Sequence, residues 1–364
     1  MGLGETMSSN PRYVPILRWK RGEWVALRYL AEDVRASLTP LVEVTPKSFA
    51  HRADGSVPTV SEALSKVAKD LVANWGWRPA FFDLLHLNEN LRSDDGLPAL
   101  VYLAREARSR GASIIPVTGL SRGRASKEAA ALVAAEGSCG ACIRLYGGDL
   151  ERPTLNSDLD TLVSQLALDP SQTDLIIDIQ FVGDTIPDWP RMLRRVPNQE
   201  RWRTLTIAAG SFPLDLTRLS VGDHRVRRTD WLGWLKLARS RGAHDRRPVF
   251  ADYTIQHGLY REAPDRANVS ASIRYTLSED WLIMRGQALR GENTGGSAQY
   301  RSEAQWLCCK QGIFCGKDFS YGDNYIFERS VRTDEPGSPE TLLRAGFNHH
   351  LTFVVRQLAS LFGT

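Results

Sequence analysis

The chain lacks several features that would place it in a specialised class of protein. Its 364 residues include only five cysteines, and this odd number argues against a disulfide framework and suits a reducing cytoplasm. No apolar run approaches the ~20 residues that a transmembrane helix needs, and the N-terminus shows no charged segment followed by an apolar core. These absences predict a cytoplasmic globular protein that does not bind a membrane.

An excess of charge of one sign is also missing. Lys and Arg number 46 against 42 Asp and Glu, so the formal net charge is only +4. A balance this even does not by itself indicate a nucleic-acid surface. Basic residues do gather at 18–21 and at 224–228, with tryptophans nearby. Nucleic-acid binding through these two stretches is therefore kept as a third functional alternative.

Familiar catalytic signatures are absent as well. No Gly-rich dinucleotide fingerprint follows the first predicted strand, and we find no P-loop, no serine nucleophile elbow and no His-Glu-x-x-His. The first predicted strand is not followed by the His-x-His of metal-dependent amidohydrolases. The sequence therefore indicates no particular reaction, and it does not decide whether the protein is an enzyme.

What the chain does contain is a repeated alternation of short apolar segments and amphipathic ones. Eight segments rich in β-branched and aromatic residues are predicted as strands, at 13–19, 38–45, 79–85, 113–120, 141–147, 174–182, 202–211 and 248–255. Helical spacing of apolar residues fills the gaps, as in 22–38 and 230–242. Alternating βα units imply parallel strands, so the α/β pattern predicts a (β/α)8 barrel of the TIM type over 13–255, with a doubly wound sheet as the alternative.

The pattern changes after the eighth predicted strand. A strand pair is expected at 272–277 and 280–287, a helix from about 303, a loop at 316–325 and a long helix from 338 to 362. We predict that 256–364 forms capping strands, loops and closing helices on one mouth of the barrel. The first 12 residues are expected to be flexible.

Single charged residues interrupt five of the predicted strands, and all of them lie late in their strands: Glu43, Asp83, Arg144, Asp178 and Asp252. Inward-facing side chains near the C-terminal mouth of a barrel are where barrel enzymes carry catalytic groups. Lys20 follows the first strand and Gln180 follows Asp178, so both are expected to point into the same space. We therefore predict a polar pocket in which Lys20 and the five strand residues are catalytic candidates and Gln180 binds ligand.

Such a cluster suits more than one role. Carboxylates can hold a divalent metal through their oxygens, or they can run acid–base chemistry when their pKa values differ, and the sequence identifies neither a metal nor another cofactor. The alternative is an internal salt-bridge layer, in which Arg144 and Lys20 neutralise part of the acid ring and hold the barrel closed.

Further ligand-binding candidates lie in the C-terminal part. Tyr275 and Arg285 belong to the predicted capping strands, and an arginine there suits a phosphate or carboxylate. His349 lies in an apolar helical segment for which Asn348 is the expected N-cap. A simpler role for this histidine is a hydrogen bond to a backbone carbonyl of the barrel.

The five cysteines form two groups, Cys139 with Cys142, and Cys308 with Cys309 and Cys315. Zinc binding would require the two groups to meet in space. Buried free thiols are the simpler expectation.

Motifs at both ends of the chain resemble the Beta protein family, which is named after a protein of a T-even bacteriophage. The opening motif comprises Tyr13, Pro15, Leu17, Arg18, Lys20, Gly22 and Glu23, followed by Pro40, Leu41 and Glu43. The segments 274–286 and 348–351 are similar to further motifs of that family. The resemblance implies a phage-related or antiphage-defence setting but no reaction, and it marks Lys20, Glu23, Glu43, Arg285, Asn348 and His349 as motif positions.

Two functional hypotheses follow for such a barrel in phage–host conflict. In the first, the mouth binds a phosphorylated or nucleotide-like ligand and acts on it as a hydrolase or transferase. In the second, the barrel is non-catalytic and binds a protein partner, encoded by a phage or a defence system, through its cap.

Overall fold

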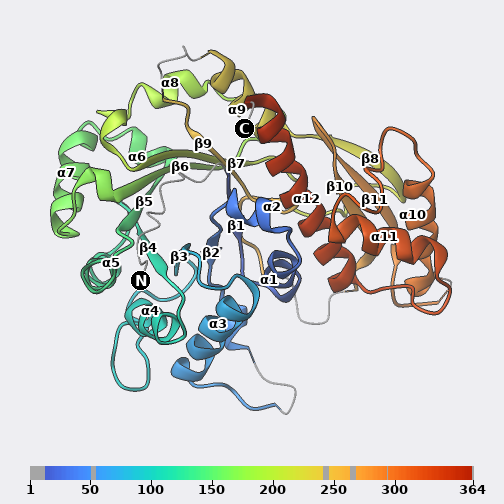
Figure 1. Cartoon of the computed structure of the whole chain (residues 1–364), viewed down its shortest axis with the longest axis horizontal. Coiled ribbons are helices and arrows are strands. Elements are labelled where there is room, and N and C mark those ends of the chain that lie inside the picture. Colours follow the sequence, from blue (N-terminus) through green and yellow to red (C-terminus); the bar gives the residue numbers. More distant parts are fainter. Residues whose placement is uncertain (1–12, 51–54, 241–245, 263–267, 293, 363–364) are drawn as a thin grey trace, which may run out of the picture.

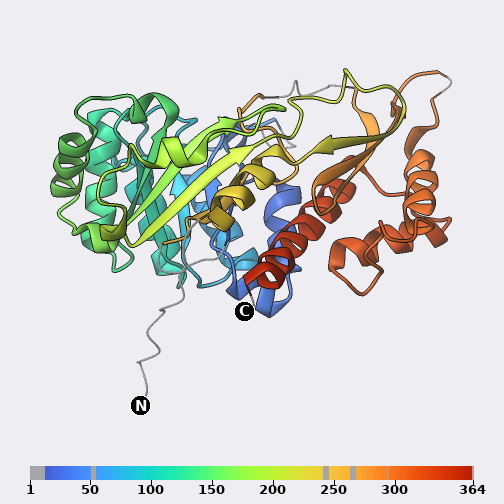
Figure 2. The ribbon, with the colours of Figure 1, turned by 90° about the horizontal axis from the view of Figure 1, so that it is seen from above.

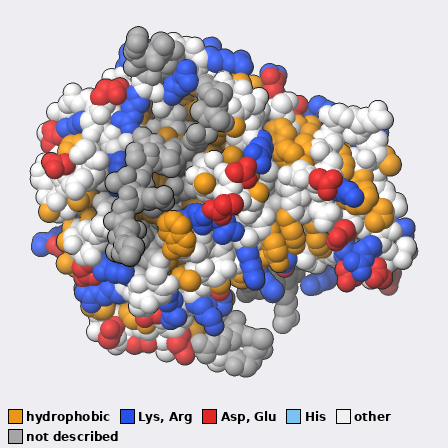
Figure 3. Space-filling view, viewed as in Figure 1, with side chains coloured by type: hydrophobic (Ala, Val, Ile, Leu, Met, Phe, Trp, Pro, Cys, Tyr) orange, Lys and Arg blue, Asp and Glu red, His pale blue; other side chains and the backbone are white. Residues whose placement is uncertain are grey.

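The computed structural model describes residues 13–50, 55–240, 246–262, 268–292 and 294–362. The expected flexible segment 1–12 lies outside the described residues. A parallel barrel occupies one side of the molecule and a smaller lobe the other, and α12 (Pro339–Phe362) runs between them (Figures 1 and 2). In the view of Figure 3, side chains of both charge signs are interspersed over the surface, as the small net charge leads one to expect.

The closed barrel confirms the predicted fold. Its strands are β1 (Tyr13–Leu17), β2 (Leu41–Glu43), β3 (Ala80–Asp83), β4 (Ile114–Thr118), β5 (Ala141–Tyr146), β6 (Thr173–Phe181), β7 (Thr204–Gly210) and β9 (Val249–Asp252). They pair in this order, each parallel to its neighbour, and β9 pairs with β1 to close the ring. Each of the eight segments predicted as a strand contributes one of them.

Helices cover the outside of the barrel. They are α1 (Arg21–Arg28), α2 (Glu32–Ala36), α3 (Val60–Asn74), α4 (Ala99–Ser109), α5 (Arg124–Glu136), α6 (Gly147–Leu150), α7 (Leu155–Gln165), α8 (Trp189–Leu193) and α9 (Thr229–Ser240). The helix α3 illustrates the local rules: Thr59 and Glu62 form a capping box at its start, and Leu64, Val67 and Leu71 form its buried stripe. The single helix expected over 22–38 is divided into α1 and α2.

The lobe contains an antiparallel sheet in the order β10 (Ser270–Thr276), β11 (Asp280–Ala288) and β8 (Gly222–Arg227). The expected strand pair corresponds to β10 and β11. The strand β8, which the sequence analysis missed, enters the sheet from the connection between β7 and α9. Two helices, α10 (Gln299–Cys308) and α11 (Tyr321–Val331), complete the lobe, and α11 begins inside the segment that was predicted as a loop.

The long helix α12 supplies the closing helix that the barrel requires. It contacts α1, α2 and β1 on the barrel side and β10 and α11 on the lobe side. Asn348 lies inside this helix and is buried, so the expectation that it caps the N-terminus is wrong: its side chain accepts a hydrogen bond from the Gly322 amide and donates one to the Ala26 carbonyl. This amide therefore links the barrel, α12 and the lobe.

The lobe borders the C-terminal mouth of the barrel on one side. Phe212 after β7 and Ile255 after β9 pack with Trp281 and Ile283 of β11. Arg274 of β10 also donates a hydrogen bond to the Ile255 carbonyl, 2.8 Å away. The connections that follow the last two barrel strands are thus the ones that contact the lobe.

Candidate functional site at the C-terminal mouth

A layer of ion pairs lies across the C-terminal end of the barrel interior. Arg144 is at its centre, and its guanidinium donates to Glu43 at 2.8 Å, to Asp83 at 2.9 Å and to Asp178 at 2.6 Å. Tyr253 donates to the same Asp178 oxygen at 2.6 Å and accepts from Arg144. Four of the six catalytic candidates therefore meet here: Arg144 and the three carboxylates around it.

The layer is electrically balanced. Arg122 donates to Asp83 at 2.8 Å, and Arg18 lies 3.6 Å from Glu43. With Arg144, these residues provide three guanidinium groups against the three carboxylates of Glu43, Asp83 and Asp178. Arg18, Arg122 and Tyr253 were missed as site residues; alternation along β9 points Ala251 and Tyr253 inward, which is the signal that could have found the tyrosine.

Strand alternation explains which charges enter the layer. Every second residue of a strand faces the barrel interior. The interior beneath the ion-pair layer is filled by apolar residues at these positions, among them Val14, Phe81, Cys142 and Ile176. Arg144 lies two residues after Cys142 and Asp178 two after Ile176, so both point inward from the next level of their strands. The register of β5 with β6 brings these two strand ends together.

Burial and neighbouring charge act against each other in the layer. The exposed fraction is 2% for Glu43, 1% for Asp83 and 0% for Arg144 and Asp178. Burial raises the pKa of Glu43, but Arg144, His86 and Arg18 outweigh it and hold the pKa at about 2. Burial likewise lowers the pKa of Arg144, while Tyr253, Asp178 and Glu43 raise it well above its ordinary value. Glu43 and the central arginine are therefore both charged at neutral pH.

The segment after β9 covers the layer. Arg18 donates to the carbonyls of His257 and Gly258, at 2.7 and 2.9 Å, and the ring of Tyr260 lies against that of His86, with centroids 4.4 Å apart. A Cβ on Gly258 would lie 1.8 Å from the Gln180 carbonyl oxygen, so only glycine permits this close contact. A ligand would reach the layer only if this segment moved, and the geometry is that of the salt-bridge alternative.

Asp252 does not join the layer, and the expectation that it faces the same space is wrong. It precedes the inward-facing Tyr253, so its side chain points out of the barrel towards α12. There it accepts from the Tyr13 hydroxyl at 2.6 Å and lies 3.0 Å from Nε2 of His350. Asp252 thus helps to fix the closing helix against β1 and β9.

The other ligand-binding candidates are distributed over separate places. Gln180 lies beside the mouth with a φ of +63°, and its backbone N–H donates to the Asp178 carboxylate. Tyr275 donates to Asp323 inside the lobe, and His349 contacts the same carboxylate at 2.9 Å and the Thr276 carbonyl. Arg285 lies on β11 and donates to the Leu219 carbonyl. These side chains do not converge with the mouth.

The two cysteine groups do not meet. Cys142 is buried inside the barrel, whereas Cys308, Cys309 and Cys315 belong to the lobe. Within the described residues, the one group of side chains that could hold a metal is Cys315, Asp323 and His349. Its carboxylate already accepts from Tyr275 and Ser320 and lies 2.9 Å from Nδ1 of His349, so it has polar partners without an ion.

A solvent-accessible cleft of about 450 Å³ opens next to the buried layer, on the side of the lobe. Its walls come from the β1–α1 connection, the segments after β7 and β9, β10 and α12. Five cationic side chains line it: Arg18, which lies 3.6 Å from Glu43 of the layer, and Lys20, Arg21, Arg261 and Arg274. Glu23 and Glu340 are its acids, and Glu340 pairs with Arg344 at 2.7 Å.

Glu23 is the buried acid of this cleft. It accepts from Nε2 of Gln256 at 2.9 Å and is only 1% exposed. Burial raises its pKa, although Lys20 and Arg18 oppose the shift. Lys20 is exposed, but partial desolvation by the cleft walls lowers its pKa; Glu23 opposes this shift, and the cationic Arg18, Lys47 and Arg274 add to it. Lys20 therefore lines this cleft rather than neutralising the buried acid ring.

The basic stretches do not form a continuous nucleic-acid surface. Arg18 is buried in the layer, and 224–227 lies within β8, where Arg225 and Arg227 are near Asp280 and Glu279. Trp231 and Trp234 are buried and pack on Phe250. None of the described helices combines the length and apolar character that crossing a bilayer requires.

Comparison with known proteins agrees with the motifs at the two ends of the chain. No curated protein matches the chain. The Beta protein family matches over residues 13–356, which include every barrel strand, the lobe and most of α12. On this match over nearly its whole length, the chain belongs to the Beta protein family.

Proposed function

We propose that the protein binds an anionic small molecule, of the phosphorylated or nucleotide-like class, in the cleft at the C-terminal mouth. The observation that carries the proposal is the convergence of Lys20, Arg21, Arg261 and Arg274 on one cleft. No carboxylate among the described residues lies within ion-pair distance of any of the four. Unpaired cations of this kind favour a ligand with negative charge.

The position of the cleft supports the same proposal. Barrel proteins frequently bind phosphate groups at the loops that follow their last strands, and the segments after β7 and β9 line this cleft. The first turn of α1 lies there too, since Lys20 to Glu23 line the cleft and form the start of that helix. A helix N-terminus presents free amide groups and a positive dipole end to an anion.

Hydrolysis or transfer at this cleft would need a group that exchanges a proton. Glu23 is that group in our proposal, because its burial raises its pKa towards the range in which a carboxyl can act as an acid. Its hydrogen bond from Gln256 fixes its orientation. The proposal includes a role in phage–host conflict, through the family resemblance, and a cytoplasmic location, which the few and unevenly numbered cysteines favour.

Calorimetric titration of the full chain with inorganic pyrophosphate and with adenosine monophosphate tests the binding proposal. We expect at least one to bind, with affinity that falls as salt is added. Lys20→Ala should weaken binding about tenfold, as expected for one lost ion pair of about 1.4 kcal/mol. The matched control is Lys69→Ala on the exposed face of α3.

Two outcomes would contradict the proposal. One is the absence of binding by both probes at low salt, and the other is equal affinity of the Lys20→Ala and Lys69→Ala variants. The competing hypothesis of a partner-binding cap gains support from the first outcome, provided that substitutions in the lobe then abolish capture of a protein partner.

A further inference from the structure

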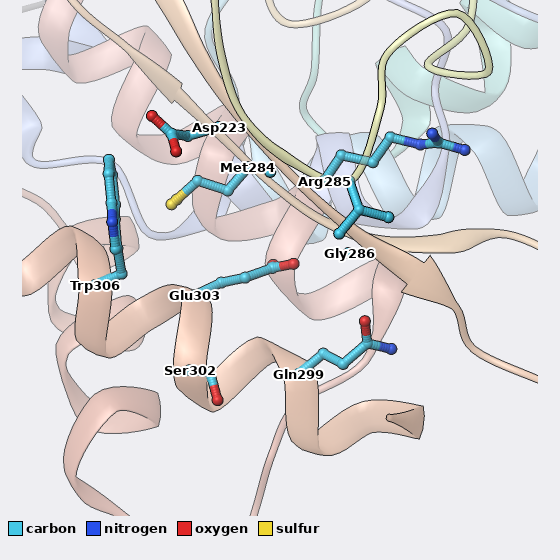
Figure 4. Close-up of a pocket in the computed structure, with 10 residues that line it drawn as sticks. Asp223, Met284, Arg285, Gly286, Gln299, Ser302, Glu303 and Trp306 are labelled. Atoms are coloured by element: carbon cyan, nitrogen blue, oxygen red, sulfur yellow. The ribbon is translucent and has the colours of Figure 1, made fainter. Parts of the chain in front are cut away.

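A second pocket lies in the lobe, remote in sequence from the residues of the mouth. It has a volume of about 320 Å³ and lies between the face of the antiparallel sheet and α10. Figure 4 shows Asp223 and Met284 on the sheet side, with Glu303 and Trp306 on the helix side. The charged residues that line the mouth cleft are mostly cations, whereas this pocket has two carboxylates and an indole.

Glu303 is the unusual residue of the pocket. Both of its carboxylate oxygens are buried, and neither has a hydrogen-bond partner within the part of the chain that the structure describes. A buried carboxylate without a partner is costly, and most buried polar groups in proteins have one. In Figure 4 its side chain extends from α10 towards β11, so the carboxylate faces the interior of the pocket.

Neighbouring polar side chains are already committed elsewhere. Arg285 extends away from Glu303 in Figure 4, and its guanidinium donates to the Leu219 carbonyl. Gln299 accepts from the Gln287 amide at 2.6 Å and donates to the Gly296 carbonyl at 3.0 Å. The side chains that flank Glu303 therefore hold the loop, strand and helix together and leave its carboxylate for a ligand.

A glycine in β11 makes room for this carboxylate. A Cβ on Gly286 would lie 2.8 Å from Oε1 of Glu303, 2.5 Å from Oε1 of Gln299 and 3.0 Å from the Cβ of Ala271. A side chain at this position would therefore displace the ends of the Glu303 and Gln299 side chains. The segment 274–286, which is similar to a family motif, ends at this glycine.

The remaining walls of the pocket suit a ligand with an apolar stem and a positively charged end. Met284 supplies a buried thioether and Val221 an exposed aliphatic side chain. The face of Trp306 already attracts one cation, because Nζ of Lys310 lies 4.6 Å from its ring centroid. Glu303 and Asp223 give the lining a negative balance, since Arg285, the one cation among the described lining residues, is turned away.

We infer that this pocket binds a small organic cation, an alkylguanidinium or alkylammonium group, through an ion pair with Glu303 and packing of its stem on Met284 and Trp306. The occupant is a small molecule because the volume is at the lower end of the range for small-molecule pockets. The inference does not rest on the proposed anion site, since the two places share no lining residue.

Binding has a defined dependence on pH. Burial raises the pKa of Glu303 to about 8, so the carboxyl is mostly protonated at neutral pH. The charged and titratable groups around it are Asp223 on β8, Arg285 on β11, and Tyr300 and Lys310 from its own helix and the residues just after it. Because a guanidinium keeps its charge throughout, its affinity should increase as pH rises from 6 to 9.

The experiment is a titration of the full chain with n-butylguanidinium at pH 9, with n-butylurea as the uncharged analogue of the same shape. We expect the cation to bind at least tenfold more tightly than the urea. Glu303→Gln should abolish this preference, whereas Glu328→Gln on α11 should retain it. Thermal melting of both variants verifies that they fold.

Three results would overturn the inference: no binding of the cation, equal affinity for cation and urea, or unchanged affinity in Glu303→Gln. Binding of an arginine-containing peptide without binding of n-butylguanidinium would also overturn it, because the pocket would then be part of a protein-docking surface. Loss of pyrophosphate binding in Lys20→Ala tests the mouth cleft alone, so failure of one site is distinguishable from failure of the other.

Discussion

The barrel mouth and the lobe treat buried carboxylates in opposite ways. At the mouth, Glu43, Asp83 and Asp178 surround Arg144, and Arg18 and Arg122 complete the balance of charge. In the lobe, both carboxylate oxygens of Glu303 are buried and have no hydrogen-bond partner among the described residues. A compensated cluster can hold a fold together, whereas an uncompensated acid reduces stability and is retained where a ligand can pair with it.

The same contrast separates the two clusters by their response to pH. The carboxyl of Glu43 has a pKa of about 2 and that of Glu303 about 8, on either side of the ordinary value of 4.5. The folded state therefore gains from ionised Glu43 and loses from ionised Glu303. Variants at these positions should change stability in opposite directions.

Removal of the central cation should have the largest effect. Arg144→Met leaves three buried carboxylates facing one another, and we expect a loss of at least about 4 kcal/mol in the free energy of unfolding. Urea denaturation measures it, with Arg124→Met on the exposed start of α5 as the control. If the variant does not fold, Asp178→Asn, expected to cost about 2–4 kcal/mol, provides the measurement. Unchanged stability in Asp178→Asn would contradict a structural role of the layer.

Acid should weaken the barrel through Glu43. Its folded pKa is below the unfolded value, so its contribution is complete above about pH 4.5 and is lost as pH falls through about 2. The difference of 4.5 − 2 corresponds to about 3 kcal/mol. Glu43→Gln should be less stable than the wild type at pH 7 and should lose less stability between pH 5 and pH 2. Parallel acid curves for the two proteins would show that Arg144 does not hold this carboxyl ionised.

Alkali should weaken the lobe through Glu303. Its folded pKa is raised, so its contribution is fully present below about pH 4.5 and is lost as pH rises through about 8. The full shift would correspond to about 5 kcal/mol, but the pocket is open to water, and we expect about 2 kcal/mol. Glu303→Gln should match the wild type near pH 4.5 and exceed its stability at pH 9. A variant no more stable than wild type at pH 9 would mean that the carboxylate has a partner.

The difference between the regions also explains what the sequence could predict. The eight barrel strands are short apolar runs at regular intervals, and all eight were found. The acids and the arginine of the layer stand out because each is a single charge within such a run. Asp252 was misassigned because the position late in a strand was used without the alternation that places Tyr253 inside.

The lobe offered weaker signals. The strand β8 has the sequence Gly-Asp-His-Arg-Val-Arg and is mostly exposed, so no apolar alternation marks it, and it is stable only because β11 pairs with it. The first turn of α11 contains Gly322, Asp323 and Asn324, which are residues typical of turns. In the sequence, Glu303 looks like any glutamate of an exposed helix face. That its carboxylate has no partner among the described residues follows from where β11 and Arg285 lie in three dimensions.

The smallest effect on stability is expected at Lys20, and it tests whether the cleft and the layer are separate. Lys20 is exposed and pairs with no described carboxylate, whereas Arg18, two residues earlier, is buried in the layer. Lys20→Ala should change the free energy of unfolding by less than about 0.5 kcal/mol, as exposed substitutions usually do. Arg18→Ala should cost several times more, because it leaves Glu43 with less compensation. Urea denaturation of the two variants makes the comparison. A large loss in Lys20→Ala would assign this lysine to the salt-bridge layer, and the cationic cleft would then belong to the support of the barrel rather than to a ligand.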